Sequence, residues 1–267
     1  MPATQPTLFI PHGAGPCFFM DWPPAGTWDA MEAYLRGIAA TLPERPRALL
    51  VVTSHWQDAA FRVSTAAQPE LVFDYYGFPA HTYELSYPAP GEPVLAQQVV
   101  ERLQAAGLDA VADAERGFDH GTFIPLMLMF PDAEIPVVQM SLRRDLDPAA
   151  HLQAGAALAA LREQGVLIIG SGMSFHNMRA GGDPRFVPIA EDFDNWLNAA
   201  VGAEPEQCRV ALKTWEQAPH ARLCHPPRAE EHLLPLMVAA GAAGQDRGRQ
   251  TYRERINGIT LSGYQFG

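Results

Sequence analysis

The sequence predicts an α/β fold, with a largely parallel central sheet flanked by helices. Short apolar segments typical of buried strands alternate with longer segments that have the spacing of amphipathic helices. This alternation favours a parallel sheet with helices on both faces. The Gly- and Pro-rich joints at 89–94 and 180–188 are too short to separate domains, so we expect residues 1–267 to form a single domain.

Six strands and six helices are expected along the chain. The strands are predicted at 7–10, 48–53, 61–65, 108–112, 135–141 and 166–170. The helices are predicted at 28–41, 94–106, 148–164, 189–201, 206–217 and 230–240. Asp147 followed by Pro148 is typical of a helix start, and Gly107 and Gly165 stand where helices are expected to end.

The composition limits the classes of partner. The chain has 267 residues, of which 48% are hydrophobic and 18% charged, enough for a sizeable core. Its net charge of -11 argues against nucleic acids and anionic membranes as partners. There is no apolar run of membrane-spanning length, and no basic segment precedes the first short apolar run. We therefore expect a cytoplasmic protein.

Three histidines follow apolar strand candidates. His12 comes after 7–10, His55 after 48–53 and His176 after 166–170. Open α/β sheets bind ligands beyond the carboxyl ends of their strands. We therefore expect these imidazoles to gather at one edge of the sheet, in a pattern that suits a metal ion.

The remaining candidate ligands have weaker signals. The three cysteines are widely and irregularly spaced, which fits neither a disulfide framework nor a zinc knuckle. His120 lies in the turn-like "DHG" before an apolar segment that could be a helix or a strand. His232 is expected in the first turn of a helix, where surface histidines outnumber ligands, although Glu230 and Glu231 beside it could complete a two-histidine, one-carboxylate site. The histidines at 81, 151 and 220 are expected to be surface or structural, whereas the role of the one at 225 stays open.

Several familiar catalytic motifs are absent from the sequence. There is no HExxH motif, and "GMSFH" at 172–176 lacks the second glycine of a hydrolase nucleophile elbow. "GSGMSF" also lacks the third glycine of a dinucleotide-binding loop. Residue spacing thus predicts a histidine metal site without naming its reaction.

The sequence resembles the class III extradiol ring-cleavage dioxygenases, most of all the single-subunit branch similar to DOPA 4,5-dioxygenase. The resemblance rests on "PHGAGP", "VVTSHWQ", "DYYGFPAHTYELSYPAPG", "GFDHGTFIPLMLMF", "GSGMSFHNMR" and "RAEEHLLPLMVAAG", which occur in the family's order. It runs from about residue 7 to the final "YQFG". It implies the one-domain α/β fold of the catalytic subunit of protocatechuate 4,5-dioxygenase, with 1–267 as one catalytic domain.

The resemblance also implies roles for the histidines. His12, His55 and His232 match the positions of metal ligands, with Glu231 as the alternative to His232 because the protocatechuate branch uses a glutamate there. His176 matches the active-site acid/base and could also approach the metal as a fourth ligand. His120 matches a second histidine of the substrate pocket.

The function implied is that of a non-haem Fe(II) extradiol dioxygenase that inserts O2 into a catechol ring to give a ring-opened semialdehyde. Zn(II) could occupy the same site but has no redox chemistry, so a zinc-dependent hydrolase is the alternative. An interaction protein that has lost catalysis is a further alternative. The expected partners are a catecholic small molecule and O2, with a homodimer possible.

Four aromatic residues are candidates for the pocket wall, with core packing as the alternative for each. Trp56, Tyr75, Tyr76 and Phe175 lie beside the histidine blocks, and the apolar segment 17–24 could cover the site or pack against a second subunit. Arg179 and Arg228 are candidates to meet a substrate carboxylate.

Overall fold

The computed structural model describes residues 3–267 and contains an eight-stranded sheet. The strands are β1 (Thr7–Pro11), β2 (Ala48–Asp58), β3 (Phe61–Ser64), β4 (Ala110–Asp113), β5 (Val137–Arg143), β6 (Val166–Gly172), β7 (Gly248–Ile256) and β8 (Ile259–Phe266). Their order across the sheet is β4-β3-β5-β2-β6-β1-β8-β7. The four central strands β5, β2, β6 and β1 are parallel, so the predicted α/β fold with a largely parallel sheet is confirmed.

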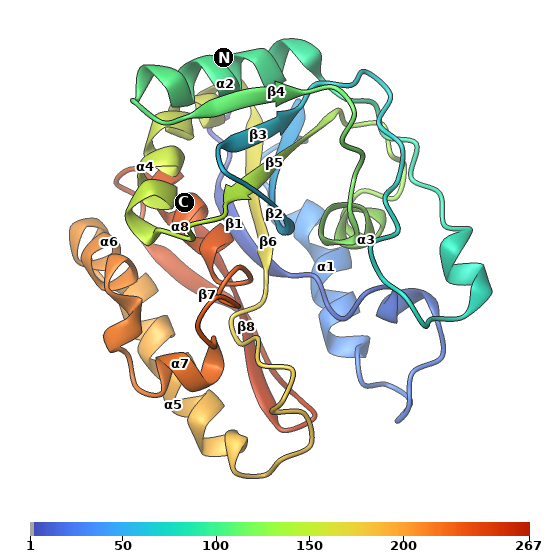
Figure 1. Ribbon diagram of the computed structural model, residues 1–267, viewed down its shortest axis with the longest axis vertical. Helices are drawn as coiled ribbons and strands as arrows, with labels where there is room; N and C mark the ends of the chain where they lie inside the picture. Colours follow the sequence, from blue (N-terminus) through green and yellow to red (C-terminus); the bar gives the residue numbers. More distant parts are fainter. Residues whose placement is uncertain (1–2) are drawn as a thin grey trace.

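The α-helices cover both faces of this sheet. They are α1 (Asp29–Thr41), α2 (Pro93–Ala105), α3 (His120–Met129), α4 (Pro148–Leu158), α5 (Phe186–Gly202), α6 (Pro205–Lys213), α7 (Ala221–Cys224) and α8 (Leu234–Ala242). Figure 1 shows α4, α5, α6 and α8 on one side of the sheet, with α1 and α3 on the other. The apolar α8 is buried throughout its length, because it packs between the central strands and α4.

All six predicted strands occur; five lie within two residues of their expected bounds, whereas β2 continues five residues beyond the expected end at 53. The predicted helices also occur, although 148–164 and 206–217 each divide into an α-helix and a short 3-10 turn, Ala159–Gln164 and Trp215–Gln217. The Asp147 carboxylate accepts hydrogen bonds from two backbone N–H groups at the start of α4, as expected of an N-cap. Gly165 ends that segment in the left-handed conformation, with φ +78°.

The terminal hairpin β7–β8 was missed by the sequence prediction. β7 is an edge strand whose side chains are mostly half-buried or exposed, so its residues "RQTYRER" carry no apolar alternation. The turn Asn257–Gly258 is nevertheless a strong hairpin signal, and both residues have positive φ here. The buried strand β8 lies antiparallel to β1 and extends the sheet beyond the site.

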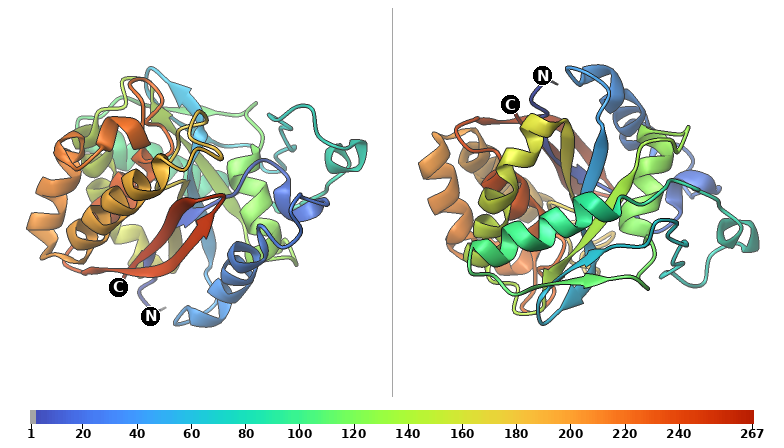
Figure 2. Two further views of the ribbon diagram at one scale, coloured as in Figure 1. Left: turned by 90° about the horizontal axis from the view of Figure 1, so that it is seen from below. Right: turned by 90° about the horizontal axis from the view of Figure 1, so that it is seen from above.

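Two long connections lie together beyond the carboxyl end of β1. Figure 2 shows the segment after β1 beside the segment 66–92 on one flank of the molecule. The Trp22 and Phe78 rings lie 6.5 Å apart, and His81 Nε2 lies 3.0 Å from the Phe19 carbonyl. These contacts form one aromatic wall next to the strand ends.

Candidate metal centre

Five histidines converge at the carboxyl ends of the neighbouring strands β2, β6 and β1. His12 follows β1 directly, His176 follows β6, and His120 begins α3. The rings of His55 and His120 are 3.8 Å apart between centroids, and those of His176 and His232 are 3.5 Å apart. The expectation that the strands deliver histidines to one edge of the sheet agrees with this arrangement.

His55 differs in detail from its expected position. The strand does not end at Thr53 but continues as β2 to Asp58, so His55 lies within it. The pairing of β2 with β5 shifts register between Val52 and Gln57. This irregularity frees His55 from the regular ladder and re-aims its side chain, as bulges near active sites do.

His232 also differs from expectation, because it lies in the turn before α8 rather than in a helix. Only 5% of the residue is exposed, so the surface role favoured by its spacing is wrong. Its carbonyl accepts a hydrogen bond of 3.0 Å from Met173 N. A Cβ at Gly172 would lie 2.1 Å from the same carbonyl oxygen, so only glycine lets the end of β6 approach this turn.

The tautomer of His12 follows from its partners. Ser171 Oγ donates its single proton to the Gly121 carbonyl, so it accepts from His12 Nδ1–H, 3.1 Å away. Burial, together with the nearby imidazole of His55, holds the pKa of His12 well below its ordinary value. The ring is therefore neutral, and its Nε2 carries a bare lone pair.

The same argument applies to His55 and His232. His55 Nδ1 lies 3.6 Å from Asp74 Oδ2, and His232 Nδ1 lies 2.9 Å from Glu231 Oε1. Since a carboxylate only accepts hydrogen bonds, Nδ1 of His232 carries the proton and its Nε2 is bare. The 3.6 Å contact of His55 is too long for a hydrogen bond, but the negative charge of Asp74 favours a proton on Nδ1 of His55 in the same way. Burial lowers the pKa of His55 to about 3 and that of His232 well below its ordinary value, so both rings are neutral.

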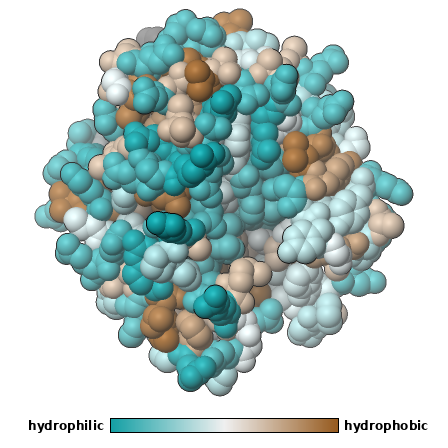
Figure 3. Space-filling model, in the orientation of Figure 1, coloured by the Kyte–Doolittle hydropathy of each residue, from teal (hydrophilic) through white to brown (hydrophobic). Residues whose placement is uncertain are grey.

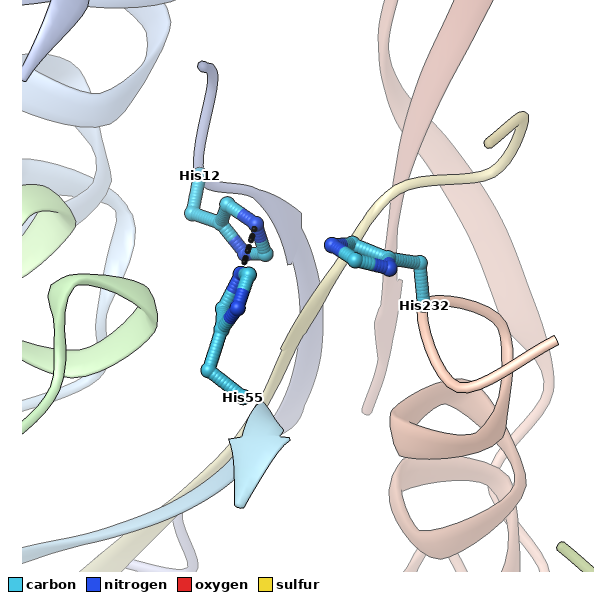
Figure 4. Close-up of side chains that lie close together, drawn as sticks. All are labelled: His12, His55 and His232. Atoms are coloured by element: carbon cyan, nitrogen blue, oxygen red, sulfur yellow. Dashed lines mark hydrogen bonds between the residues drawn. The ribbon is translucent and has the colours of Figure 1, made fainter. Parts of the chain in front are cut away.

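The rings of His12, His55 and His232 point toward one another at the strand ends (Figure 4). The Nε2 atoms of His12 and His55 are 3.1 Å apart, and one ligand atom of each of these two residues and of His232 lies within 4.8 Å of the others. Facing lone pairs repel one another unless a cation lies between them. The donor set is that of imidazole metal sites, and carboxylate or hydroxyl partners on the outer nitrogens are the usual support of such ligands.

His176 stacks on His232 with an interplanar angle of 21° and is half-buried. Among residues 3–267 its Nδ1 finds no hydrogen-bond partner, and it lies 3.5 Å from Glu231 Oε1. Burial lowers the pKa of His176 to about 4, so the ring is neutral at pH 7. This imidazole is free to accept a proton.

His120 is fixed by Asp74, which the sequence analysis did not select. The Asp74 carboxylate accepts from His120 Nδ1 at 2.7 Å and from the His120 backbone N–H at 3.0 Å. The only sequence signal for Asp74 is its place at the start of the "DYYGFPAHTYELSYPAPG" block. These bonds leave the Nε2 of His120 available to a ligand.

Asp119 anchors the start of α3 to β2. Its carboxylate is fully buried, accepts from Thr53 Oγ1 at 2.7 Å and forms an ion pair with Arg116 at 3.0 Å. A Cβ at Gly121 would lie 2.6 Å from Thr53 Oγ1 and 2.9 Å from His55 Cδ2. Glycine therefore permits the close contact that brings His55 and His120 together.

The other four histidines lie outside the centre. His151 and His225 are fully buried, whereas His81 and His220 are exposed. His225 Nε2 bonds to the Ser174 carbonyl, so its ring is tied to the backbone.

The five converging histidines open into a cavity of about 380 Å³. Figure 3 shows that this face of the molecule is hollowed near its middle. Phe175 lines the cavity as expected, and so does Trp22 of the segment 17–24. Tyr75 instead packs edge-on against His120, with ring centroids 5.8 Å apart.

Other expected contacts with the cavity are wrong. Tyr76 is 90% exposed, and Trp56 packs under Arg116 rather than lining the cavity. Arg179 and Arg228 are exposed and absent from the lining. The sequence around these residues carries no signal of the direction in which their side chains point.

Comparison with known proteins identifies the family. Residues 6–267 match the family described as "Catalytic LigB subunit of aromatic ring-opening dioxygenase". The chain is 38% identical to "Dioxygenase tasH" of Hapsidospora irregularis, over 98% of this chain and 85% of that protein. It is 36% identical to "4,5-DOPA dioxygenase extradiol" of Beta vulgaris, over 96% of this chain and 93% of that protein.

A curated protein and a crystal structure from Escherichia coli are also similar to this chain. The protein named "4,5-DOPA dioxygenase extradiol" is 35% identical, over 89% of this chain and 85% of its own length. The crystal structure of uncharacterized protein JW3007 superposes with a TM-score of 0.79 at 30% identity, covering 98% of this chain and 100% of that one. In the described residues of our chain, no helix has the length and apolarity needed to cross a bilayer.

The resemblance drawn from the sequence is thus confirmed, and the chain is an extradiol ring-cleavage dioxygenase, with a small molecule and O2 as its substrates. This chain belongs to the family of the catalytic LigB subunit of aromatic ring-opening dioxygenases.

Proposed function

We propose that this protein uses Fe(II) to insert both atoms of O2 into a catechol ring beside the two hydroxyl groups, giving a ring-opened semialdehyde. The convergence of three bare imidazole lone pairs carries the proposal. Substituted catechols are the proposed substrate class, and DOPA is the member of that class for which two of the relatives are named.

His12, His55 and His232 would hold the metal through their Nε2 atoms. Glu231 acts through His232, because its Oε1 lies on the outer nitrogen of that ring. Bound Fe(II) supplies the redox chemistry that joins a catechol to O2, which Zn(II) lacks because it has a single accessible oxidation state.

His176 serves as the acid/base. The His176 ring lines the cavity and is neutral at pH 7, so it can take a proton from a catechol hydroxyl as the substrate binds. The resulting imidazolium can return that proton during ring opening, with Glu231 near enough to stabilise the charge.

His120 positions the substrate. Asp74 holds its Nδ1, so the Nε2 can receive a hydrogen bond from a hydroxyl group of the catechol. The aromatic and aliphatic walls of the cavity exclude bulk water from the reacting ring.

Oxygen uptake tests the proposal. The apoprotein is loaded with Fe(II) or with Zn(II), and each form is mixed with a panel of catechols. We expect oxygen consumption and a yellow ring-opened product with Fe(II) alone. Product formation by the Zn(II) form without oxygen uptake would instead favour the zinc-dependent hydrolase.

A further inference from the structure

The walls of the cavity above the histidines are mainly aromatic and aliphatic. The segments 13–28 and 66–92 contribute Trp22, Trp28 and Phe78, and the hairpin β7–β8 contributes Ile256, Ile259 and Leu261. In the described part of the chain, the polar side-chain groups of the lining besides the five histidines are the amides of Asn177 and Asn257 and the indole N–H groups of Trp22 and Trp28. Within residues 3–267, no Lys, Arg, Asp or Glu belongs to it.

The three charged groups that contact the histidines of the centre are already paired. Asp74 is bonded to His120, and Glu231 to His232. Arg116 forms its ion pair with Asp119 and lies over the Trp56 ring, 5.4 Å from its centroid. These groups pair with residues of the protein itself and are absent from the cavity lining.

The lining determines which ring substituents bind well. A carboxylate or ammonium group that enters this cavity loses hydration and gains no oppositely charged partner there, which is costly. An alkyl or aryl group gains contact with the aromatic and aliphatic walls instead.

We propose that this enzyme selects catechols whose ring substituent is uncharged and apolar, over those that carry a carboxylate or an ammonium group. The proposal rests on the proposed function, since it names the substrate class of the same centre. It separates the substrate of this chain from amino-acid catechols such as DOPA, which carry both charges.

Three catechols of similar size test the preference. Propylcatechol is neutral, dihydrocaffeate carries a carboxylate, and dopamine carries an ammonium group. With the Fe(II) enzyme at pH 7, we expect kcat/KM for propylcatechol to exceed both others at least tenfold. A ratio below tenfold against either charged compound overturns the proposal.

Binding gives a readout that does not depend on ring cleavage. Trp22 and Trp28 line the cavity, so quenching of tryptophan fluorescence reports occupancy in the anaerobic Zn(II) protein. We expect propylcatechol to bind at least tenfold more tightly than dihydrocaffeate. If no catechol is opened by the Fe(II) enzyme but this order of affinity holds, the proposed function fails while the binding preference stands. If dihydrocaffeate binds as tightly, the preference fails.

A variant at the edge of the cavity tests whether the absence of a cation causes the preference. Met178 lines the cavity and is 84% exposed, so a new side chain there should not disturb folding. Met178→Arg places a cation near the substituent, with Met178→Gln as the matched uncharged control. We expect the preference for propylcatechol over dihydrocaffeate to narrow at least fivefold in Met178→Arg alone. Equal preferences in the two variants would contradict the assignment of selectivity to the missing cation.

Discussion

Glu231 and His232 are neighbours in the chain, and Oε1 of the carboxylate lies 2.9 Å from Nδ1 of the imidazole. A carboxylate that bonds to Nδ1, the ring nitrogen that points away from the metal, is itself held away from the metal. The geometry therefore favours His232 as the third ligand, with Glu231 as the group that fixes its tautomer and orientation.

Two substitutions determine which of these residues, Glu231 or His232, binds the metal. We expect His232→Ala to abolish stoichiometric metal binding. Glu231→Gln should still bind one metal ion, with affinity lowered about 10–100-fold, because the amide oxygen can accept from Nδ1–H but carries no charge. Metal titration of both variants measures this. Loss of the metal in Glu231→Gln with retention in His232→Ala would make the carboxylate the ligand.

The role of His176 can be separated from metal binding. We expect His176→Ala to keep its Fe(II) and to lose ring-cleavage activity by about 10²–10⁴-fold, the usual contribution of a positioned acid/base. His220→Ala, at an exposed position outside the centre, is the matched control and should keep full activity. If His176→Ala instead purifies without metal after reconstitution, the residue is a ligand.

Asp74 links His55, the proposed metal ligand, with His120, the proposed substrate-positioning residue. We expect Asp74→Asn to lower kcat/KM at least tenfold and to weaken metal binding as well, because both imidazoles lose a charged acceptor. Asp192→Asn, at a half-exposed site that faces only His220, serves as the control. Unchanged kinetics and metal affinity in Asp74→Asn would show that the carboxylate is structural alone.

Buried neutral histidines make stability depend on pH. Burial lowers the pKa of His151 to about 4, and its ring is bonded on both sides, by the Asp147 carbonyl and the Arg143 N–H. The unfolded chain therefore takes up a proton near pH 6.5 while the folded protein does not, and stability is lost as the pH falls from about 6.5 towards 4.

The effect can be measured on the metal-free protein. Between pH 7 and pH 5.5, His151 should lower the free energy of unfolding by about 1 kcal/mol. His151→Asn removes this contribution, so the difference in stability between the two pH values should shrink by that amount, even if the variant is less stable overall. Burial raises the pKa of Asp119 to about 6, so its contribution to the free energy of unfolding increases as the pH falls. Because Asp119 is present in both proteins, this contribution cancels in the comparison. An identical pH dependence in the two proteins would contradict the account.

Much of the fold was predictable because the central strands are apolar throughout and the helices carry start and stop residues. The position of His12 at a strand end followed directly from this pattern. The direction of His55 did not, because it depends on a register shift between two strands far apart in sequence. His232 depends on the contact of its turn with Gly172, which no local pattern records.

The side walls of the cavity were harder to predict than the histidines at its base. Phe175 was found from its place beside His176, whereas Ile259 and Leu261 come from a terminal strand that the sequence pattern missed. That strand reaches the site through its antiparallel pairing with β1, a contact between the two ends of the chain. Local sequence reasoning has no access to such a pairing.

The use of labelled dioxygen tests the central claim most directly. The Fe(II)-loaded protein is given a catechol under oxygen-18 gas, and the product is analysed by mass spectrometry as soon as it forms. We predict one ring-opened product per O2 consumed, with both labelled atoms in that product. A ring-opened product whose new oxygen atoms come only from water would contradict a dioxygenase and support hydrolytic chemistry at the same histidines.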